Sequence, residues 1–79
     1  MTDEKIEVVS YSGLRSEEKP RAFFLADRKV DVAEILDAWI EEGFDDRTRR
    51  RFFKVRGSDG SVHKIYIEEK THVWHRVIR

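Results

Sequence analysis

The densest group of side chains able to do chemistry is a run of basic residues in the second half of the chain. It consists of Arg47, Arg49, Arg50, Arg51, Lys54 and Arg56, with the aromatic ring of Phe52 inside the run. Guanidinium groups pair with phosphates and aromatic faces stack on bases, so this combination is typical of a surface that follows a nucleic-acid backbone. The sequence therefore predicts a candidate nucleic-acid-binding cluster at residues 47–56.

The residues just before this run favour a different interpretation. Glu41, Glu42, Asp45 and Asp46 lie directly upstream, and the whole chain balances 16 basic residues against 16 acidic ones. Domains that bind nucleic acid usually carry a net positive charge. We therefore expect the arginines to meet these acids, which makes binding to a protein partner the first hypothesis and nucleic-acid binding the alternative.

Charge is distributed unevenly along the chain. Residues 1–46 hold thirteen acids and six bases, whereas residues 47–79 hold ten bases and three acids. Opposite charges on neighbouring strands stabilise a sheet, so the two halves are expected to pair inside one domain. The alternative is a bipolar surface that attracts an anionic partner or a second copy of the chain.

Residues suited to catalysis or metal binding are scarce. The chain has no cysteine, none of its serines lies in a Gly-x-Ser-x-Gly context, and its four glycines are too dispersed for a phosphate loop. His72 and His75 are three residues apart and would point to opposite faces of a strand, while His63 and His75 could be neighbours across two strands. Half-buried, hydrogen-bonded histidines are the commoner outcome. We therefore expect no catalytic residues, no metal and no cofactor, and the protein is not expected to be an enzyme.

The elements that must position these side chains are clearest at residues 51–78, which predict a three-stranded antiparallel meander. Phe53 and Val55 share one face of its first strand, and the stretch Gly57–Gly60 supplies a tight turn. Apolar and polar residues alternate again over 62–67, residues 69–71 turn the chain, and residues 73–78 form the third strand.

The first part of the chain predicts two further strands. Residues 1–5 are expected to be a frayed terminus, residues 6–11 a strand with a local irregularity, and residues 21–26 another strand. Residues 12–20 lack apolar periodicity and end at the only proline, so they predict a loop. The whole chain, residues 1–79, is expected to form a single small domain.

Two structures compete for residues 32–42. Val32, Ile35, Leu36, Trp39 and Ile40 have the spacing of one face of a helix, with helix-capping signals at both ends. The same segment also fits a long strand with a bulge near residues 34–35 that changes which face is apolar. The local signals favour the helix slightly.

Several motifs resemble those of a family of small, uncharacterised bacterial proteins. YSGLRSEEKPRAF at residues 11–23 is followed by V-x-E-I-L-D-x-W at 32–39, FFKVR-x-x-DG at 52–60 and Trp74. The family is similar to another uncharacterised bacterial domain that is sometimes found beside translesion-type DNA polymerases. The resemblance implies a mostly β fold, which favours the bulged strand. It also implies that the loop is either structured or an interaction surface, formed by Tyr11, Ser12, Gly13, Arg15, Glu17 and Glu18.

Together these patterns predict a mainly β domain, with five antiparallel strands in a small barrel or bent sheet and at most one short helix at residues 32–42. The chain has no cysteine, no apolar N-terminal stretch and no run of about 20 apolar residues, so we expect a cytoplasmic protein that does not enter a membrane. The expected function is a non-enzymatic interaction module that binds a protein partner or associates with itself.

Overall fold

The computed structural model describes residues 3–12, 18–43 and 48–78, and all of their side chains except those of Tyr11, Ser12 and Glu18. Within these ranges the chain forms seven strands and no helix, so the mainly β prediction is confirmed. The strands are β1 (Glu4–Ile6), β2 (Val8–Ser12), β3 (Glu18–Leu25), β4 (Arg28–Glu42), β5 (Arg49–Gly57), β6 (Val62–Glu68) and β7 (Val73–Arg76). Over the same ranges, nothing helical is long and apolar enough to cross a membrane.

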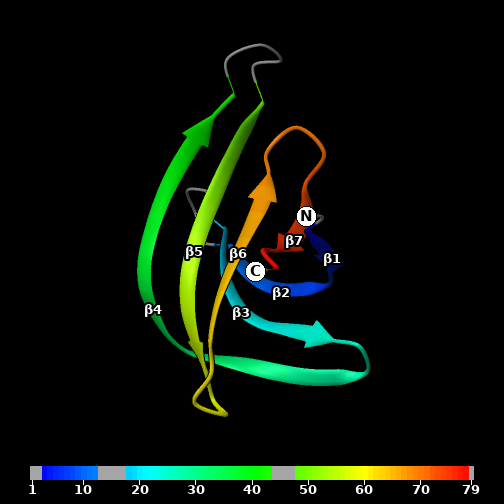
Figure 1. Ribbon diagram of the computed structural model, residues 1–79, viewed down its shortest axis with the longest axis vertical. Coiled ribbons are helices and arrows are strands. Elements are labelled where there is room, and N and C mark those ends of the chain that lie inside the picture. The colour runs from blue at the N-terminus through cyan, green and yellow to red at the C-terminus, as the bar shows by residue number, and fades with distance from the viewer. Residues whose placement is uncertain (1–2, 13–17, 44–47, 79) are drawn as a thin grey trace.

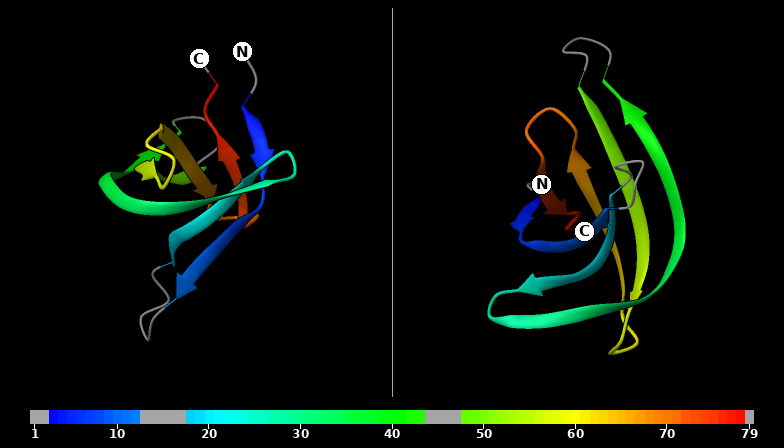
Figure 2. Two further views of the ribbon diagram at one scale, coloured as in Figure 1. Left: turned by 90° about the horizontal axis from the view of Figure 1, so that it is seen from below. Right: turned by 180° about the vertical axis from the view of Figure 1, so that it is seen from behind.

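All of these strands belong to one antiparallel sheet that curls into a nearly closed barrel (Figures 1 and 2). Their order is β1-β7-β6-β5-β4-β3-β2. The first and last strands in this order, β1 and β2, are separated in the chain by Glu7 alone. The N–H of Phe24 donates to the C=O of Glu7 at 3.0 Å, so β3 also contacts this junction.

The prediction of five strands is wrong for two reasons. The predicted strand at residues 6–11 divides at Glu7, because β1 pairs with β7 whereas β2 pairs with β3. Residues 32–42, where a helix is one of the two expectations, form the second half of β4. The predicted frayed terminus includes Glu4 and Lys5, which pair with β7, so this end of the chain is part of the sheet.

Two bulges explain why β4 resembles a helix in sequence. The register of β4 against β5 shifts between Val32 and Glu34 and again between Ile35 and Asp37. Each bulge adds one residue, so residues that face the core are three apart there instead of two. Val32, Ile35 and Ala38 therefore share the inner face at a spacing that a helix also produces. The bulged strand is confirmed, and the helix is wrong.

The core lies between the inner faces of the strands. It consists of Ile6, Phe23, Val30, Phe53, Val55, Ile65, Ile67 and Trp74. Phe23, Val55 and Ile65 are completely buried. Burying a side chain of this size stabilises a fold by about 1.5–3 kcal/mol.

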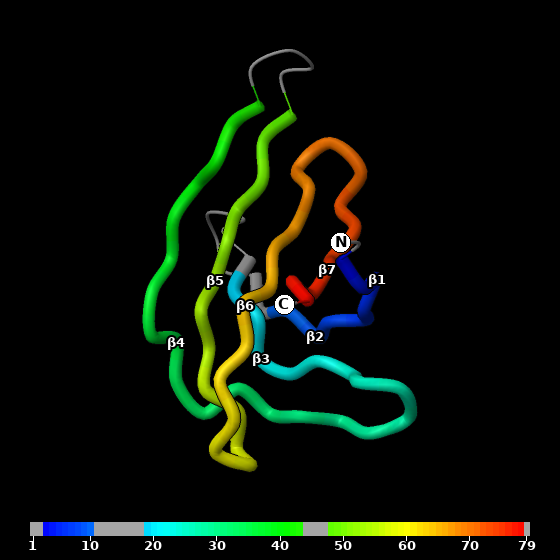
Figure 3. The backbone as a smooth tube through the Cα atoms, viewed as in Figure 1, coloured from blue at the N-terminus to red at the C-terminus, as the bar shows by residue number. Residues whose placement is uncertain are grey.

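The turn between β5 and β6 and the turn between β3 and β4, both visible in Figure 3, constrain small residues in them or beside them. A Cβ atom on Gly57 would lie only 2.7 Å from Cγ1 of Val30, so only glycine fits there without a shift. Gly60, in the turn between β5 and β6, has a φ of 88°, which glycine adopts readily. Ala26, in the two-residue turn between β3 and β4, has a φ of 56°.

A second cluster of rings lies on the outer face of β4, β5, β6 and β7, and we call it the aromatic ladder. It consists of Trp39, Phe52, Tyr66 and His75, each directly opposite the next across neighbouring strands. Successive ring centroids are 5.3, 4.7 and 5.1 Å apart. Burial and a hydrogen bond to Asp3 raise the pKa of Tyr66 to about 12. The ladder therefore packs the outer face much as the core packs the inner one.

Ion pairs connect the acidic half of the chain to the basic half, as the pairing interpretation expects. Arg76 lies 2.8 Å from Glu4 across β7 and β1. Arg56 on β5 pairs with Glu34 on β4. Each pair joins an acid of residues 1–46 to a base of residues 47–79.

Candidate interaction site

β3 and β4 pair along only part of their length. In the described sheet, Ala22–Leu25 pair with Arg28–Asp31, whereas β4 from Val32 onward pairs with β5 alone. The two strands diverge beyond that point, and a pocket of about 360 Å³ is lined by residues of β3, β4 and β5. We call this region the β3–β4 opening.

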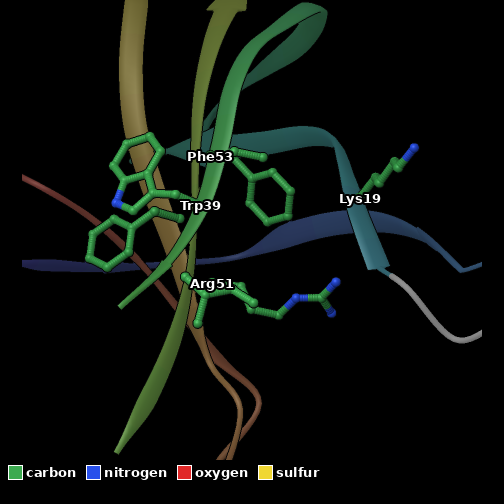
Figure 4. A pocket seen from close by; sticks show the side chains of 7 residues that line it. Lys19, Trp39, Arg51 and Phe53 are labelled. Carbon is green, nitrogen blue, oxygen red and sulfur yellow. The ribbon is translucent and has the colours of Figure 1, made fainter. Parts of the chain in front are cut away.

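The pocket has an apolar floor and a basic rim. Phe53 is 5% exposed and contributes to the floor beside Ala38, while Ile40 is 48% exposed next to them. Lys19 extends from β3 and Arg51 from β5, with Phe53 between them in the view of Figure 4. Such a lining suits an apolar group that lies beside a negative charge.

The carboxylates near the rim leave a positive charge at the opening. Arg51 Nε lies 3.6 Å from Glu69 Oε2, and Arg49 Nε lies 3.8 Å from Glu69 Oε1 and from Glu42 Oε2. These distances exceed the range of about 2.7–3.2 Å that is usual for a hydrogen bond. Lys19 is exposed and forms no ion pair with any residue in the described ranges. The opening therefore has three cations, Lys19, Arg49 and Arg51, against the two carboxylates of Glu42 and Glu69.

The predicted nucleic-acid-binding cluster is divided between two faces of β5. Successive side chains of a strand point to opposite faces. Arg49 and Arg51 share the inner side with Phe53, whereas Arg50, Lys54 and Arg56 lie on the outer side with Phe52. Arg47 lies outside the described residues. The structure therefore does not bring the cluster together on one surface.

Two of the three outer cations of this cluster lie close to a carboxylate. Arg50 Nε lies 3.3 Å from Glu68 Oε2, and Arg56 pairs with Glu34. Lys54 forms no ion pair within the part of the chain that the structure describes. Phe52 is only 7% exposed, because its ring lies in the aromatic ladder. Its faces are therefore not open to a nucleic-acid base.

The predicted interaction loop falls mostly outside the described residues. Gly13, Arg15 and Glu17 are not among them. Tyr11 and Ser12 form the end of β2, and Glu18 begins β3, so the backbone pairs Tyr11 with Lys19 and Ser12 with Glu18.

The histidines do not assemble into a metal site. His63 faces the core, where its ring packs edge-on against Phe23, whereas His75 lies in the outer aromatic ladder. The two are therefore not neighbours on one face, which corrects that expectation. Within the described ranges, no three His, Asp or Glu side chains form a group that could hold a metal ion.

Polar contacts define the surroundings of His63. Ser61 Oγ lies 2.7 Å from His63 Nε2 and donates to Asp59 Oδ1 at 2.6 Å. Burial lowers the pKa of His63, and the charge of Arg76 lowers it further. This group of side chains is a hydrogen-bonded structural network.

Sequence reasoning missed three residues of the pocket: Lys19, Ala38 and Ile40. The sequence places Lys19 in the predicted loop at residues 12–20, and the spacing of Ile40 matches a helix face. No sequence signal could have found them, because the pocket depends on β4 extending beyond β3 in the folded sheet, where β4 has 15 residues and β3 has 8. A strand that extends beyond its neighbour exposes one edge.

Comparison with known proteins identifies the family of this chain but assigns it no activity. No curated protein and no solved structure matches the chain. The model of one protein family matches residues 1–77, which is nearly the whole chain. The chain therefore belongs to the family defined by a domain of unknown function, DUF6504.

Proposed function

We propose that this protein is an interaction module that binds an extended segment of a partner protein as an added strand along the open edge of β4. The observation that carries the proposal is the one-sided pairing of Ala38–Glu42, which pair with β5 and with no other described strand. Such an edge offers unpaired N–H and C=O groups, and many domains capture extended peptides in this way.

Hydrogen bonds near the tip of the β4–β5 hairpin indicate which backbone groups are free. The N–H of Gly43 donates to the C=O of Thr48 at 2.9 Å, toward β5. Because successive residues direct these groups to alternate sides, the N–H and C=O of Ile40 point to the open edge. The N–H of Ala38 has the same direction and donates to Oδ1 of Asp37 at 2.8 Å.

The usable part of the edge is short and regular. Both bulges of β4 lie before Asp37, and from there the register with β5 runs without interruption to Glu42. Bulges twist an edge away from further pairing. An added strand is therefore expected to pair with residues 38–42, where the exposed side chain of Ile40 and the pocket provide an apolar contact.

The charge of β4 favours a basic segment over a second copy of this chain. Its second half carries four acids and no base: Glu34, Asp37, Glu41 and Glu42. Antiparallel pairing of two such edges would place carboxylates opposite each other, which is destabilising. Asp37 and Glu41 lie on the outer face and form no ion pair within the described residues. A segment with lysine or arginine on its outward face suits them.

Nucleic-acid binding has less support in the same geometry. Arg50 and Arg56 meet carboxylates, and the ring of Phe52 is covered. Lys54 and Lys64 lie opposite each other on the outer face of β5 and β6, and neither forms an ion pair within the described ranges. The alternative is therefore best tested by looking for a response at these two lysines.

A synthetic peptide can test the proposal directly by NMR titration of the isotope-labelled protein. Acetyl-Lys-Val-Lys-Val-Lys-Val-amide presents lysines on one face and valines on the other when it is extended. We expect it to shift the backbone amide resonances of residues 38–42. The same peptide with glutamate in place of lysine should leave them unchanged. Absence of any shift at residues 38–42 with the lysine peptide would overturn the proposal.

Two variants control for the place of binding. Ile40→Pro removes an N–H that faces the open edge and not β5, so it is expected to keep the hairpin and lose the peptide. Val62→Thr changes a side chain that is 51% exposed on β6, and it should bind the peptide as the original protein does. Shifts at Lys54 and Lys64 on adding a short oligonucleotide, together with no response to the peptide, would favour the alternative.

A further inference from the structure

Resting on the proposed function, we infer that the bound segment carries a carboxylate on its inward face, held at the β3–β4 opening by Lys19 and Arg51. The partner would then have a two-sided pattern. Bases face outward toward Asp37 and Glu41, and apolar residues with one carboxylate face the pocket.

The register of β4 and β5 identifies the face on which this carboxylate would lie. Ala38 is opposite Phe53 and Ile40 is opposite Arg51, so all four side chains belong to the inner face. In a strand added beyond β4, every second side chain would lie on this same face. Those side chains would enter the space between β4 and β3, on which Lys19 borders.

The two cations at the opening have unused bonding capacity. The nearest atoms of Arg51 and Glu69, Nε and Oε2, are 3.6 Å apart, and the Arg51 side chain is 25% exposed. A guanidinium group has five N–H donors, so its terminal nitrogens remain able to bind a second carboxylate. Lys19 forms no ion pair within the described ranges. A carboxylate placed between β3 and β5 would therefore gain two cationic neighbours.

Opposite charges on the two faces would also fix how the segment binds. Shifting a strand by one residue exchanges its two faces. In that register its carboxylate would meet Asp37 and Glu41, and its bases would meet Lys19 and Arg51. Both contacts are repulsive, so the charge pattern selects one register as well as adding affinity.

A matched peptide series tests the carboxylate separately from strand addition. In acetyl-Lys-Val-Lys-Val-Lys-Val-amide, each valine is replaced in turn by glutamate and, in parallel, by glutamine. We expect the best glutamate peptide to bind about tenfold more tightly than its glutamine match, as hydrogen bonds to charged groups imply. A further peptide with all three valines and a free C-terminal carboxylate shows whether the charge can come from a chain end.

Protein variants then locate the effect. Lys19→Gln and Arg51→Gln should each reduce the advantage of glutamate over glutamine, which is the ratio of the two peptide affinities measured in the same variant. Lys70→Gln, which alters an exposed lysine in the turn after β6, should retain the full advantage. Thermal unfolding of each variant confirms that it is folded.

The outcomes separate this inference from the proposed function. If both peptides of every pair bind at residues 38–42 with equal affinity, strand addition stands and the carboxylate inference is overturned. If no peptide binds there, the proposed function fails and the inference fails with it. If the glutamate advantage persists in both the Lys19→Gln and Arg51→Gln proteins, these residues do not hold the carboxylate.

Discussion

At the end of the barrel that holds the β5–β6 turn, polar side chains bond to one another, whereas at the β3–β4 opening several are left with weak partners or none among the described residues. We call the first region the closed end. There Asp59 Oδ1 accepts hydrogen bonds from both the N–H and the hydroxyl of Ser61, at 3.1 and 2.6 Å. The hydroxyl oxygen also contacts His63, whose ring packs against the buried Phe23. Every polar group in this chain of contacts has a partner.

The β3–β4 opening differs in both its polar and its apolar side chains. Lys19 has no ion pair among the described residues, and Arg51 has a distant one. Ile40 is 48% exposed, whereas Phe23 at the closed end is 0% exposed. The contrast supports assigning stability to the closed end and, under the proposed function, binding to the opening. Substitutions at the two ends should therefore change different measurements.

The largest effect is expected from truncating the core at the closed end. Phe23→Ala removes a completely buried ring and should lower the free energy of unfolding by about 3–5 kcal/mol. Ile40→Ala at the opening should change it by no more than about 0.5 kcal/mol. Chemical denaturation followed by tryptophan fluorescence measures both.

A milder core variant keeps this comparison measurable. Phe23→Leu retains most of the apolar volume and is expected to cost about 1.5 kcal/mol. If Ile40→Ala cost as much as Phe23→Leu, the two ends would not differ in their contribution to stability.

The second effect concerns the close approach of Gly57 to β4. Gly57→Ala places a Cβ atom 2.7 Å from Cγ1 of Val30, so we expect a loss of about 1–3 kcal/mol in the free energy of unfolding. Gly60→Ala has open space around it but a φ of 88°, and backbone strain there should cost about 1 kcal/mol.

A double-mutant cycle distinguishes these two causes. Val30→Ala removes Cγ1, one of two atoms that a Cβ on Gly57 would approach within 3.0 Å, the other being Oδ1 of Asp59. The combined cost with Gly57→Ala should therefore be smaller than the sum. With Gly60→Ala the two costs should add. Additivity in both cycles would show that crowding against Val30 is not what requires glycine at position 57.

The parts of the fold that could be predicted from the sequence are the strands whose inward and outward residues alternate with a regular period of two. β5 and β6 alternate without interruption, so the meander and its core residues Phe53, Val55 and Ile65 could be predicted. β4 could not be assigned from its own residues, because two bulges give it the spacing of a helix. The division at Glu7 also escaped prediction, since it depends on two different pairing partners and not on a local turn signal.

The site was less predictable than the fold for a related reason. The sequence predicts that Arg51 is a binding residue, but it predicts phosphate as the ligand. The neighbours of Arg51 along the chain, Arg50 and Phe52, lie on the other face of β5. Ile40 lies opposite Arg51 in the register of β4 with β5, whereas Lys19 borders the same pocket because β3 and β4 diverge. Divergence is a property of how strands are placed in three dimensions, so it leaves no motif in the sequence.

A stabilising change is expected in the turn between β3 and β4. Ala26 has a φ of 56°, a left-handed conformation that is unfavourable for a residue with a side chain. Ala26→Gly should therefore raise the free energy of unfolding by about 0.5–1 kcal/mol. Among described residues other than glycine, only Ala26 and His72 have a positive φ, so Asp27 gains nothing from the same change. Asp27→Gly should destabilise slightly, because glycine adds entropy to the unfolded chain. Equal effects at both positions would contradict the strain at Ala26.

The smallest effect is a pH dependence that belongs to the closed end alone. Burial lowers the pKa of His63, the nearby charges of Arg76 and Arg28 lower it further, and Asp59 opposes them. The unfolded chain, with an ordinary histidine pKa of about 6.5, then binds more protons than the folded one at mildly acidic pH. The contribution of His63 to stability is thus complete above about pH 6.5 and is lost as the pH falls toward the lowered pKa of the folded state.

Thermal unfolding between about pH 8 and pH 5 should show this decline. His63→Gln should flatten it, and Ile40→Ala at the opening should leave it intact. A decline that survives in His63→Gln would assign the titration to another group and remove this distinction between the two ends.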